Sequence, residues 1–527
     1  YNEKSSFVYD RDWITEATNS KGNVRFDYDL GGRVTGIHYP DGSIAGYEWN
    51  QANLCTTILY PDGNRVEYSY DSFGNLTKAN LLDDILYYSY DEKHRLVKKQ
   101  SNSFIQNLIY HENGKLKTLS VQDDAGVLLE IQYNYDEFYN RLIEKTIFER
   151  DREILSYDYA YDKRGLLVKT WKNGELFGEY KYDAFGNIFY SKESKEEARY
   201  TYNAQNQLLQ KDFMGQIYSY EYNARGDLIC ERLDGKILST YQYNGLGQLL
   251  YAVNEKGSVQ YSYDALGNRI EAEFTYKNLK KEKEIYYPGY LTENGLPLCK
   301  RSIEKNISQN FYFDQSPMAE NLDGKLIWTI CDDDQNPVLR LKDENNYEIS
   351  DYSPFGVCKK YQRGEGFKLF STEYGFNSHI YDNFLNRHIT YNRVYDPKNG
   401  RFHSKDICIG DFKDPLSFNR YIYKSNSFKN IFTNIDLAKD FAVAKSFIVS
   451  NIAIEAVSKS PLNILSTLIY NKPSKEAVTA CLNPLYSGLE DILQKNIKFS
   501  AGLGNSNFSC TEDIRPFFSK ENTLLLS

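Results

Sequence analysis

Cysteine and histidine, the side chains that most often form metal sites and nucleophilic centres, are few and widely spaced in this sequence. The chain of 527 residues has 8 Cys and 6 His, and no two cysteines form a Cys-x-x-Cys pair. Zinc sites and thiol redox centres need closely spaced ligands. The spacing therefore predicts no metal site and no cofactor, and the cysteines are expected to be separate buried thiols.

Residues 437–527 offer little catalytic chemistry. All the histidines lie before residue 404, so this segment cannot contain a His-based nuclease, a Cys–His nucleophile or a His-ligated metal. Its two cysteines, Cys481 and Cys510, have no histidine within the segment to activate them, so inert thiols are expected. Its Lys+Arg 9 nearly balance its Asp+Glu 8, which predicts no basic groove for nucleic acid.

The same segment has the pattern of short helices. Apolar residues recur near helical spacing from 441 to 457, and Pro461, Pro473 and Pro484 interrupt the chain beyond that stretch. We therefore expect residues 437–527 to form a small, mostly α domain. Insertion of its first helix into a membrane is the weaker alternative, because Lys445 and Glu455 lie within that helix.

The charge of the whole chain excludes some partners. Lys+Arg 63 against Asp+Glu 72 gives a net charge of -9, which disfavours general binding to nucleic acid or to anionic membranes. No stretch approaches the ~18 uninterrupted apolar residues that a spanning helix needs, so no stable membrane span is expected. Since the sequence begins at Tyr1 rather than Met, we interpret it as a piece of a longer polypeptide.

The elements that position any functional residue come from a repeat. A Tyr-Asp pair, or a close variant, recurs thirteen times between residues 9 and 264 in steps of 19 to 26 residues. Each copy reads aromatic-x-Tyr-Asp-x-x-Gly-x-Leu, as in Tyr68–Leu76. Residues two apart share one face of a strand, the Asp can hydrogen-bond the following turn, and the Gly accepts a left-handed backbone. One repeat therefore predicts one β-hairpin.

Hairpins of this kind are marginal alone and must stack to share a core. The tyrosines are then expected to be structural, and an exposed aromatic platform for sugars or bases is the alternative. The repeats resemble those of the Rhs/YD-repeat family, which includes bacterial polymorphic toxins, the C component of insecticidal toxin complexes and the YD shells of teneurins. The resemblance implies a mainly β fold in which residues 1–270 form a spiralling strip of hairpins around a hollow shell.

That shell is expected to be partial. The strands of this chain would cover on the order of 4,000 Å², roughly half of what a wall around a folded C-terminal domain needs.

Between residues 271 and 436 the Tyr-Asp pair no longer recurs at a regular spacing, and a second signature of the same family appears. Residues 391–406 are similar to the Rhs-associated core signature R-x-Y-D-P-x-x-G-R-F-x-S-x-D. Its fixed positions are occupied here by Tyr395, Asp396, Pro397, Gly400, Arg401 and Phe402. The residues by themselves predict a strand, a turn with Pro and Gly at favoured positions, and a return strand. The resemblance implies that 271–436 is a core that closes the shell.

In several members of the family the end of this core cleaves its own backbone with two aspartates. The matching positions here are Asp406 and Asp436. Two carboxylates brought together share a proton, so one can act as acid and the other as base. The family usually has Asp-Pro-x-Gly at each position, whereas this chain has Asp406-Ile-Cys-Ile-Gly410 and Asp436-Leu-Ala-Lys439. Self-cleavage and a structural role in turns both stay open.

The resemblance also implies a function. The chain would be the β-shell scaffold of an exported Rhs-type polymorphic toxin, secreted or at the bacterial cell surface, with its own C-terminal domain as cargo for delivery to competing or host cells. An immunity protein and a secretion apparatus would be its partners. The alternatives are a cell-surface adhesion protein whose tyrosines bind glycans, and a core with autoproteolytic activity.

Overall fold

The computed structural model describes residues 4–290, 297–305, 307–314, 316–322, 324–364, 372–390, 393–406, 415–423, 500–503 and 506–509. These residues are mainly β, as the sequence predicts. They contain no α-helix, and their only helical turns are the 3₁₀ turns η2 (Phe376–Ser378) and η3 (Pro415–Phe418). No helix among them is long and apolar enough to cross a membrane.

One sheet of 34 strands dominates the structure, and each strand pairs antiparallel with the next along the chain. The first 26 strands, which we call the outer turn, are β1 (Ser6–Asp10), β2 (Trp13–Asn19), β3 (Gly22–Tyr28), β4 (Val34–His38), β5 (Ile44–Trp49), β6 (Cys55–Leu59), β7 (Arg65–Tyr70), β8 (Leu76–Leu81), β9 (Asp84–Tyr90), β10 (Leu96–Gln100), β11 (Ile105–Tyr110), β12 (Leu116–Asp123), β13 (Gly126–Tyr135), β14 (Leu142–Glu149), β15 (Arg152–Tyr161), β16 (Leu167–Lys172), β17 (Glu175–Tyr182), β18 (Ile188–Glu193), β19 (Glu196–Tyr202), β20 (Leu208–Phe213), β21 (Gln216–Tyr222), β22 (Leu228–Leu233), β23 (Lys236–Tyr243), β24 (Leu249–Asn254), β25 (Gly257–Tyr263) and β26 (Arg269–Tyr276).

The same sheet continues without a break into eight further strands, which we call the inner turn. These are β27 (Lys281–Pro288), β28 (Pro297–Ser302), β29 (Ile307–Phe313), β30 (Pro317–Leu322), β31 (Lys325–Cys331), β32 (Pro337–Asp343), β33 (Asn346–Tyr352) and β34 (Cys358–Arg363). Within the sheet, β1 pairs only with β2 and β34 only with β33. The strip is therefore open at both ends and is not a closed barrel.

The predicted hairpin is the repeating unit of the outer turn. In the repeat of β7 and β8, the Asp71 carboxylate accepts hydrogen bonds from the backbone N–H groups of Phe73 and Asn75, each at 2.9 Å. The N–H of Gly74 donates to the Asp71 carbonyl at 3.1 Å, and Gly74 has a φ of 85°. The Asp and the Gly of the motif thus act together, since one anchors the turn and the other supplies its left-handed residue.

The tyrosine of each Tyr-Asp pair connects successive hairpins. In repeat after repeat its hydroxyl donates to the carbonyl of the first residue of the return strand of the preceding repeat, or of the second residue in the case of Ile14. The bonds, 2.6 to 2.8 Å long, join Tyr28 to Ile14, Tyr70 to Cys55, Tyr90 to Leu76, Tyr110 to Leu96, Tyr161 to Leu142, Tyr182 to Leu167, Tyr202 to Ile188 and Tyr263 to Leu249. Where the first aromatic residue of the motif is a tyrosine it is buried, as Tyr68 and Tyr88 show. The tyrosine ladder is therefore structural, not a surface platform.

Replacing Gly74 with Val is expected to lower the free energy of unfolding by about 1–3 kcal/mol, because a β-branched residue tolerates a positive φ poorly. Gly245 is the matched control: its φ is not positive, and an added Cβ would have no atom within 4 Å. Gly245→Val should cost under about 0.5 kcal/mol. Chemical denaturation measures both, and equal losses would show that the left-handed backbone is not the cause.

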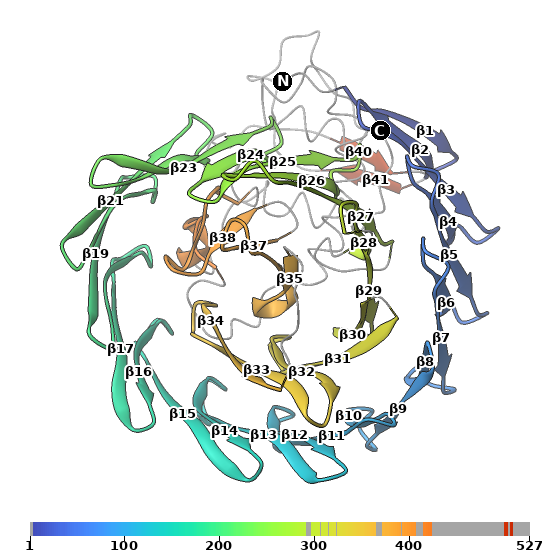
Figure 1. Ribbon diagram of the computed structural model, residues 1–527, viewed down its shortest axis with the longest axis horizontal. Coiled ribbons are helices and arrows are strands. Elements are labelled where there is room, and N and C mark those ends of the chain that lie inside the picture. The colour runs from blue at the N-terminus through green and yellow to red at the C-terminus, as the bar shows by residue number, and fades with distance from the viewer. Residues whose placement is uncertain are drawn as a thin grey trace.

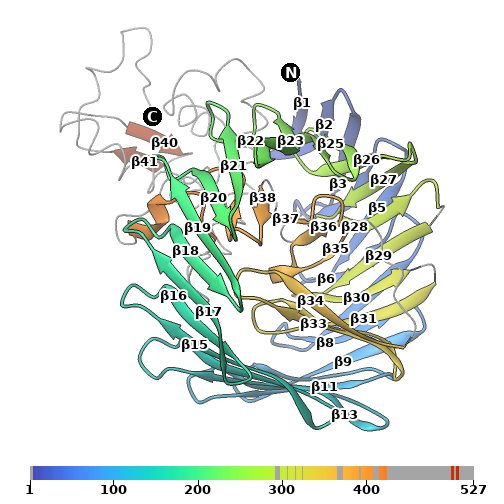
Figure 2. The ribbon, with the colours of Figure 1, turned by 60° about the vertical axis from the view of Figure 1, so that its left-hand side comes forward.

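The strip winds into a spiral, so that the inner turn lies inside the outer one (Figure 1). The two turns are in direct contact: the rings of Tyr60 and Tyr312 lie 5.3 Å apart, as do those of Phe104 and Trp328. The Tyr60 hydroxyl donates to the Phe311 carbonyl at 2.9 Å. A single apolar cluster runs through both turns. Viewed from the side, the strands of the inner turn run beside those of the outer turn, which forms the wall of the ring (Figure 2).

A second, five-stranded sheet lies within the ring (Figure 1). Its strands are β35 (Thr372–Tyr374), β36 (Ile380–Asp382), β37 (Arg387–Ile389), β38 (Val394–Asp396) and β39 (Arg401–Phe402), each paired with the next. We call this sheet, together with η2, η3 and residues 403–406 and 419–423, the plug. Its Phe384, Leu385 and Val394 pack into an apolar cluster with β18–β26 of the outer turn and with Tyr286 of β27. The plug thus rests on the part of the wall that the inner turn leaves uncovered.

The predicted small α domain at the C-terminus finds no support. The stretch expected to be helical, 441–457, lies outside the described residues. What the structure describes of 437–527 is an antiparallel hairpin of β40 (Ser500–Leu503) and β41 (Ser506–Ser509).

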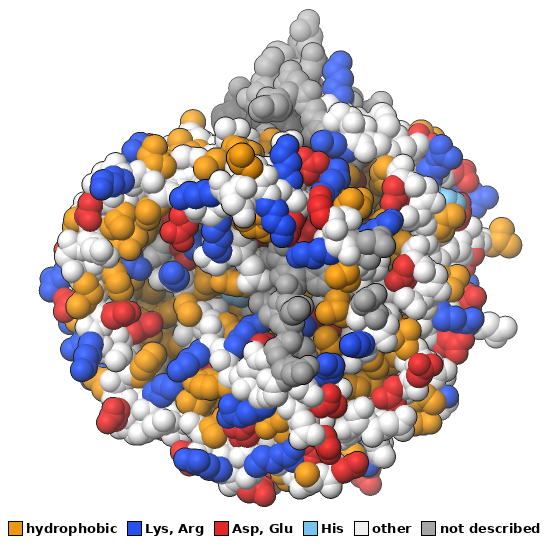
Figure 3. All heavy atoms as spheres, viewed as in Figure 1, with side chains coloured by type: hydrophobic (Ala, Val, Ile, Leu, Met, Phe, Trp, Pro, Cys, Tyr) orange, Lys and Arg blue, Asp and Glu red, His pale blue; other side chains and the backbone are white. Residues whose placement is uncertain are grey.

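On the face in Figure 3, acidic and basic side chains are interspersed, without a patch of one sign.

Candidate functional site

The core signature folds as its residues predict. Tyr395 and Asp396 end β38, the turn follows, and Arg401 and Phe402 form β39. Gly400 closes the turn with a φ of 62°. The Asp396 carboxylate accepts a hydrogen bond from the backbone N–H of Lys398 at 2.9 Å, which holds the turn as the aspartates of the repeats do.

The side chains of the signature are buried and join the plug to its surroundings. The Tyr395 hydroxyl donates to the Phe355 carbonyl at 2.9 Å, and an added Cβ on Gly400 would lie 3.1 Å from the Phe355 ring. Arg401 donates to the Asn187 side chain at 2.9 Å and lies over the Tyr202 ring at 4.7 Å. Pro397 and Phe402 are also buried. The six signature positions from Tyr395 to Phe402 are therefore buried and have structural roles.

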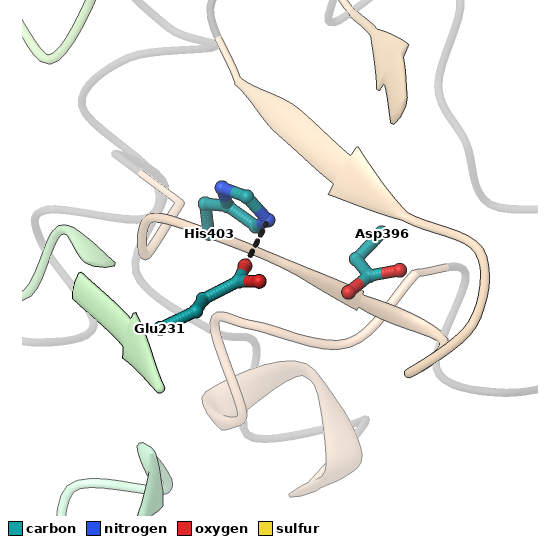
Figure 4. A group of neighbouring side chains, drawn as sticks. All are labelled: Glu231, Asp396 and His403. Atoms are coloured by element: carbon teal, nitrogen blue, oxygen red, sulfur yellow. Dashed lines mark ion pairs between the residues drawn. The ribbon is translucent and has the colours of Figure 1, made fainter. Parts of the chain in front are cut away.

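Next to the signature lies a buried cluster of charges between wall and plug. It consists of Glu231 on β22, Asp396 on β38 and His403 after β39, which Figure 4 shows, together with Arg387 on β37. The Arg387 guanidinium lies 3.1 Å from the Asp396 carboxylate and 3.4 Å from that of Glu231, and its Nε donates to His403 Nε2 at 3.4 Å. The Tyr241 hydroxyl donates to Glu231 at 3.2 Å. We call Glu231, Arg387, Asp396 and His403 the latch.

The latch is better explained as an ion network than as a metal centre. The ligand atoms of Glu231, Asp396 and His403 lie within 4.8 Å of one another, a spacing that a divalent cation accepts. However, Arg387 is within 3.4 Å of all three, so the protein itself supplies the positive charge that the carboxylates need.

Burial sets the electrostatics of the latch. It lowers the pKa of His403 to about 3, with the Arg387 charge acting in the same direction, so the imidazole is neutral. It also raises the pKa of Glu231, which Arg387 only partly offsets. Burial also acts to raise the pKa of Asp396, but the positive charges of Arg387 and Lys211 outweigh it, so the pKa of Asp396 is lowered. The network binds plug to wall and has no solvent-facing group for catalysis.

The latch predicts a pH dependence. Because the pKa of His403 is about 3 when folded and 6.5 when unfolded, the unfolded chain gains a proton as the pH falls below 6.5 and the folded chain does not. The free energy of unfolding therefore falls as the pH drops from 6.5 to 3. Between pH 7 and pH 5 the contribution of His403 to this fall is about 2 kcal/mol. In His403→Gln the loss over that range should be smaller by this amount. Urea denaturation at both pH values measures it, and parallel losses in the two proteins would contradict it.

The motifs did not point to Glu231, Arg387 or His403, although the repeats carry a signal for one of them. The fourth residue of each return strand, counted from the Leu after the turn, faces inward opposite the first aromatic residue, as Ala79 faces Tyr68. In four repeats this position is charged, and each such side chain contacts the inner turn or the plug. The pairs are Lys99 with Asp314 at 2.6 Å, Lys145 with Asp332 at 3.7 Å, Lys211 with Asn399 at 3.0 Å and Glu231 with Arg387 at 3.4 Å.

Of the two aspartates matched to self-cleavage, the structure places one. Asp406 is partly exposed, and its carboxylate pairs with the Arg393 guanidinium at 2.6 Å. Its backbone N–H donates to the Arg420 carbonyl at 2.8 Å, and the Arg420 guanidinium donates to the Asp406 carbonyl. Asp436 lies outside the described residues. The geometry therefore shows a well-anchored aspartate in the plug.

The described cysteines are only in part the buried thiols that their spacing predicts, since Cys331 and Cys358 are partly exposed. Cys55, Cys230 and Cys299 are buried, and burial raises the pKa of the Cys55 thiol to about 11. A thiol with a raised pKa stays protonated at neutral pH and is a poor nucleophile. These cysteines therefore do not form a reactive site.

A spiral strip of Tyr-Asp hairpins that winds inward onto a plug defines a class of protein, the YD-repeat shell. Residues 82–430 match the family model for the teneurin YD-shell, and residues 9–44 and 49–81 match the model for the RHS repeat. The chain belongs to the teneurin YD-shell family.

Its relatives include both toxins and teneurins. The chain is 24% identical over 417 residues to double-stranded DNA deaminase toxin A of Burkholderia cenocepacia, covering 73% of this chain and 28% of the relative. It is 27% identical over 282 residues to the tRNA3(Ser)-specific nuclease WapA of Bacillus spizizenii, covering 46% and 12%. Teneurin-3 of Danio rerio is 24% identical over 403 residues, covering 69% and 14%. The chain thus spans less than a third of the length of these relatives.

Among solved structures, the Tc holotoxin pore of Photorhabdus luminescens with a TccC3 variant has a similar fold. The TM-score is 0.58 at 13% sequence identity, and the match covers 81% of this chain and 24% of that one. This likeness extends the shell fold to most of the chain.

Proposed function

We propose that this chain is the shell scaffold of an Rhs-type polymorphic toxin, which holds a C-terminal effector for delivery to other cells. The observation that carries the proposal is the inward winding of the strip onto a plug that buried charges fasten to the wall. One relative of the chain is named a double-stranded DNA deaminase toxin, and another is named a tRNA3(Ser)-specific nuclease. In this proposal the protein is exported, and an immunity protein protects the producing cell.

The path of the chain supports the proposal. Tyr423, the last described residue before 424–499, packs within the plug: its ring lies 5.1 Å from that of Tyr395 and 5.8 Å from those of Phe376 and Phe402. Its hydroxyl donates to the Asn377 side chain at 2.6 Å. The chain that leads to the proposed cargo, residues 437–527, therefore leaves the described plug at Tyr423, inside the ring.

Expression in a susceptible bacterium tests the scaffold proposal. Residues 437–527 alone should inhibit growth, and the full chain should inhibit it much less because the shell holds the cargo. Equal inhibition by both would contradict containment. If neither inhibits growth and residues 1–436 bind glycans on an array, the adhesion alternative takes its place.

For the aspartates we propose a structural role. The Asp406 carboxylate is held by Arg393 at 2.6 Å and its backbone N–H by the Arg420 carbonyl at 2.8 Å, so both parts of the residue are fixed within the plug. Purified full-length protein should therefore run as one uncut band on a denaturing gel, and Asp406→Asn should run in the same way. A fragment the size of residues 437–527 that disappears in Asp406→Asn would instead establish self-cleavage.

A further inference from the structure

Two contacts between a lysine amine and an asparagine amide join the wall to the plug. On β20, Lys211 donates from Nζ to the side-chain carbonyl of Asn399 at 3.0 Å. In the turn after β24, Lys256 donates from Nζ to the side-chain carbonyl of Asn386, also at 3.0 Å. A lysine amine and an asparagine amide can condense to an isopeptide bond with release of ammonia. The surroundings of each contact decide whether it can react.

The orientation of the Asn399 amide follows from its partners. Its Nδ2 donates to the Asp396 carboxylate at 2.8 Å and to the Tyr220 hydroxyl at 3.2 Å. A flipped amide would place Nδ2 against the Lys211 amine and Oδ1 against the carboxylate, and both contacts would be repulsive. The amide carbon of Asn399 therefore lies beside a lysine amine, and the nitrogen that would leave is already bonded to a buried carboxylate.

The surroundings of Lys211 favour the neutral, nucleophilic form of its amine. Lys211 stands opposite Tyr200 in the pairing of β19 with β20, and its Nζ lies 5.3 Å from the centre of the Tyr200 ring and 5.4 Å from that of Phe213. Burial lowers the pKa of Lys211, although Asp396 and Glu193 offset part of this effect. A lysine with a lowered pKa carries more free amine at neutral pH, and the rings limit the access of water.

We propose that Lys211 and Asn399 join in an intramolecular isopeptide bond, with Asp396 as the proton relay. Nζ of the neutral Lys211 attacks Cγ of Asn399, so that an Nζ–Cγ bond forms and the Cγ–Nδ2 bond breaks. The Asp396 carboxylate takes the proton that Nζ loses and returns it to Nδ2, which leaves as ammonia. The reaction needs no oxidant, reductant or other reactant, and the chain becomes lighter by about 17 Da, the mass of ammonia.

The bond would fasten the plug to the wall covalently, next to the latch. It joins two positions that are 188 residues apart in the sequence. A covalent link across such a distance restricts the unfolded chain, as a disulfide does, without the need for an oxidising compartment. The inference does not depend on the nature of the cargo and therefore goes beyond the proposed function.

The contact of Lys256 with Asn386 is the internal comparison. It has the same distance between amine and carbonyl, and it also joins the wall to the plug. Among the described residues, however, no carboxylate is hydrogen-bonded to the Asn386 side chain, so no group is in place to move the proton. We expect this second contact to stay an ordinary hydrogen bond.

Mass spectrometry of the purified full chain tests the proposal. The intact mass should lie about 17 Da below the mass of the sequence, and a digest should contain one branched peptide that joins Lys211 to Asn399. Lys211→Arg keeps the positive charge but cannot form the bond, so it should have the full mass of its sequence. Lys256→Arg is the matched control and should keep the loss. A full chain with the unchanged mass of its sequence would overturn the proposal.

A second product of equal mass is distinguished by the same variants. Asn399 precedes Gly400, and an Asn-Gly pair can lose ammonia by reaction with its own backbone, which gives a succinimide. A succinimide links no second peptide, takes up water in mildly alkaline buffer and still forms in Lys211→Arg. A mass loss that persists in Lys211→Arg would therefore overturn the proposal. The branched peptide is sought in the unsubstituted chain, so this readout stands even where a variant fails to fold.

The role of Asp396 has a test of its own. Asp396→Asn, checked by circular dichroism for an intact β fold, should leave Lys211 and Asn399 unlinked because the proton relay is gone. Complete linkage in this variant would show that Asp396 takes no part in the reaction.

Discussion

Arg387→Met is expected to lower the free energy of unfolding by about 3–5 kcal/mol, because it leaves two buried carboxylates without their cation. Glu231 and Asp396 both depend on this guanidinium, at 3.4 and 3.1 Å. Methionine keeps much of the volume of the side chain, so the loss reports charge rather than a cavity. Chemical denaturation of the full chain measures it.

Two further variants show whether the charge is the cause. Arg199 forms an ion pair of similar length with Glu197, at 3.0 Å, but its side chain is 72% exposed. Arg199→Met should therefore cost under about 1 kcal/mol. Adding Glu231→Gln to Arg387→Met should recover part of the loss, since it removes one stranded charge. Similar losses for Arg387→Met and Arg199→Met would show that the latch does not fasten the plug.

Trp328→Ala is expected to destabilise the protein by about 3–5 kcal/mol through the cavity that it leaves. Trp328 is 2% exposed and lies where the inner turn meets the outer one, with its ring against that of Phe104. Thermal or chemical unfolding of the variant measures the loss.

The control for this substitution is Phe138, whose side chain is 89% exposed in a turn. Phe138→Ala should change stability by no more than about 0.5 kcal/mol. If Phe104→Ala and Trp328→Ala are combined, their effects should fail to add by about 0.5–3 kcal/mol, because the two rings share one contact. Full additivity would mean that the two turns are not energetically coupled at this contact.

The hairpins and the core turn could be predicted from the sequence because their determinants are local. Asp71 and Gly74 act within one turn, and Asp396 and Gly400 do the same in the signature. The family resemblance supplied the strip and its spiral. The continuation of one sheet through β34 has no such signal, since the Tyr-Asp motif is lost after residue 264 while the alternating strands persist.

The candidate site was predicted only in part. The signature led to Asp396 and Arg401, but Glu231 and Arg387 belong to segments more than a hundred residues apart, and no local pattern joins them. The fourth position of the return strand is the one clue, because Lys99, Lys145, Lys211 and Glu231 are charges at a place that otherwise faces the interior.

The sequence alone thus determined the repeating unit, its turn chemistry and the inward face of the strands that carry the Tyr-Asp motif, since these depend on residues within one hairpin. The tertiary structure decided that the strip overlaps itself and which charges meet inside it. The physical reason is that winding accumulates from the small twist between successive strands. Phe104 therefore meets Trp328, and Glu231 meets Arg387, only after many strands have been added.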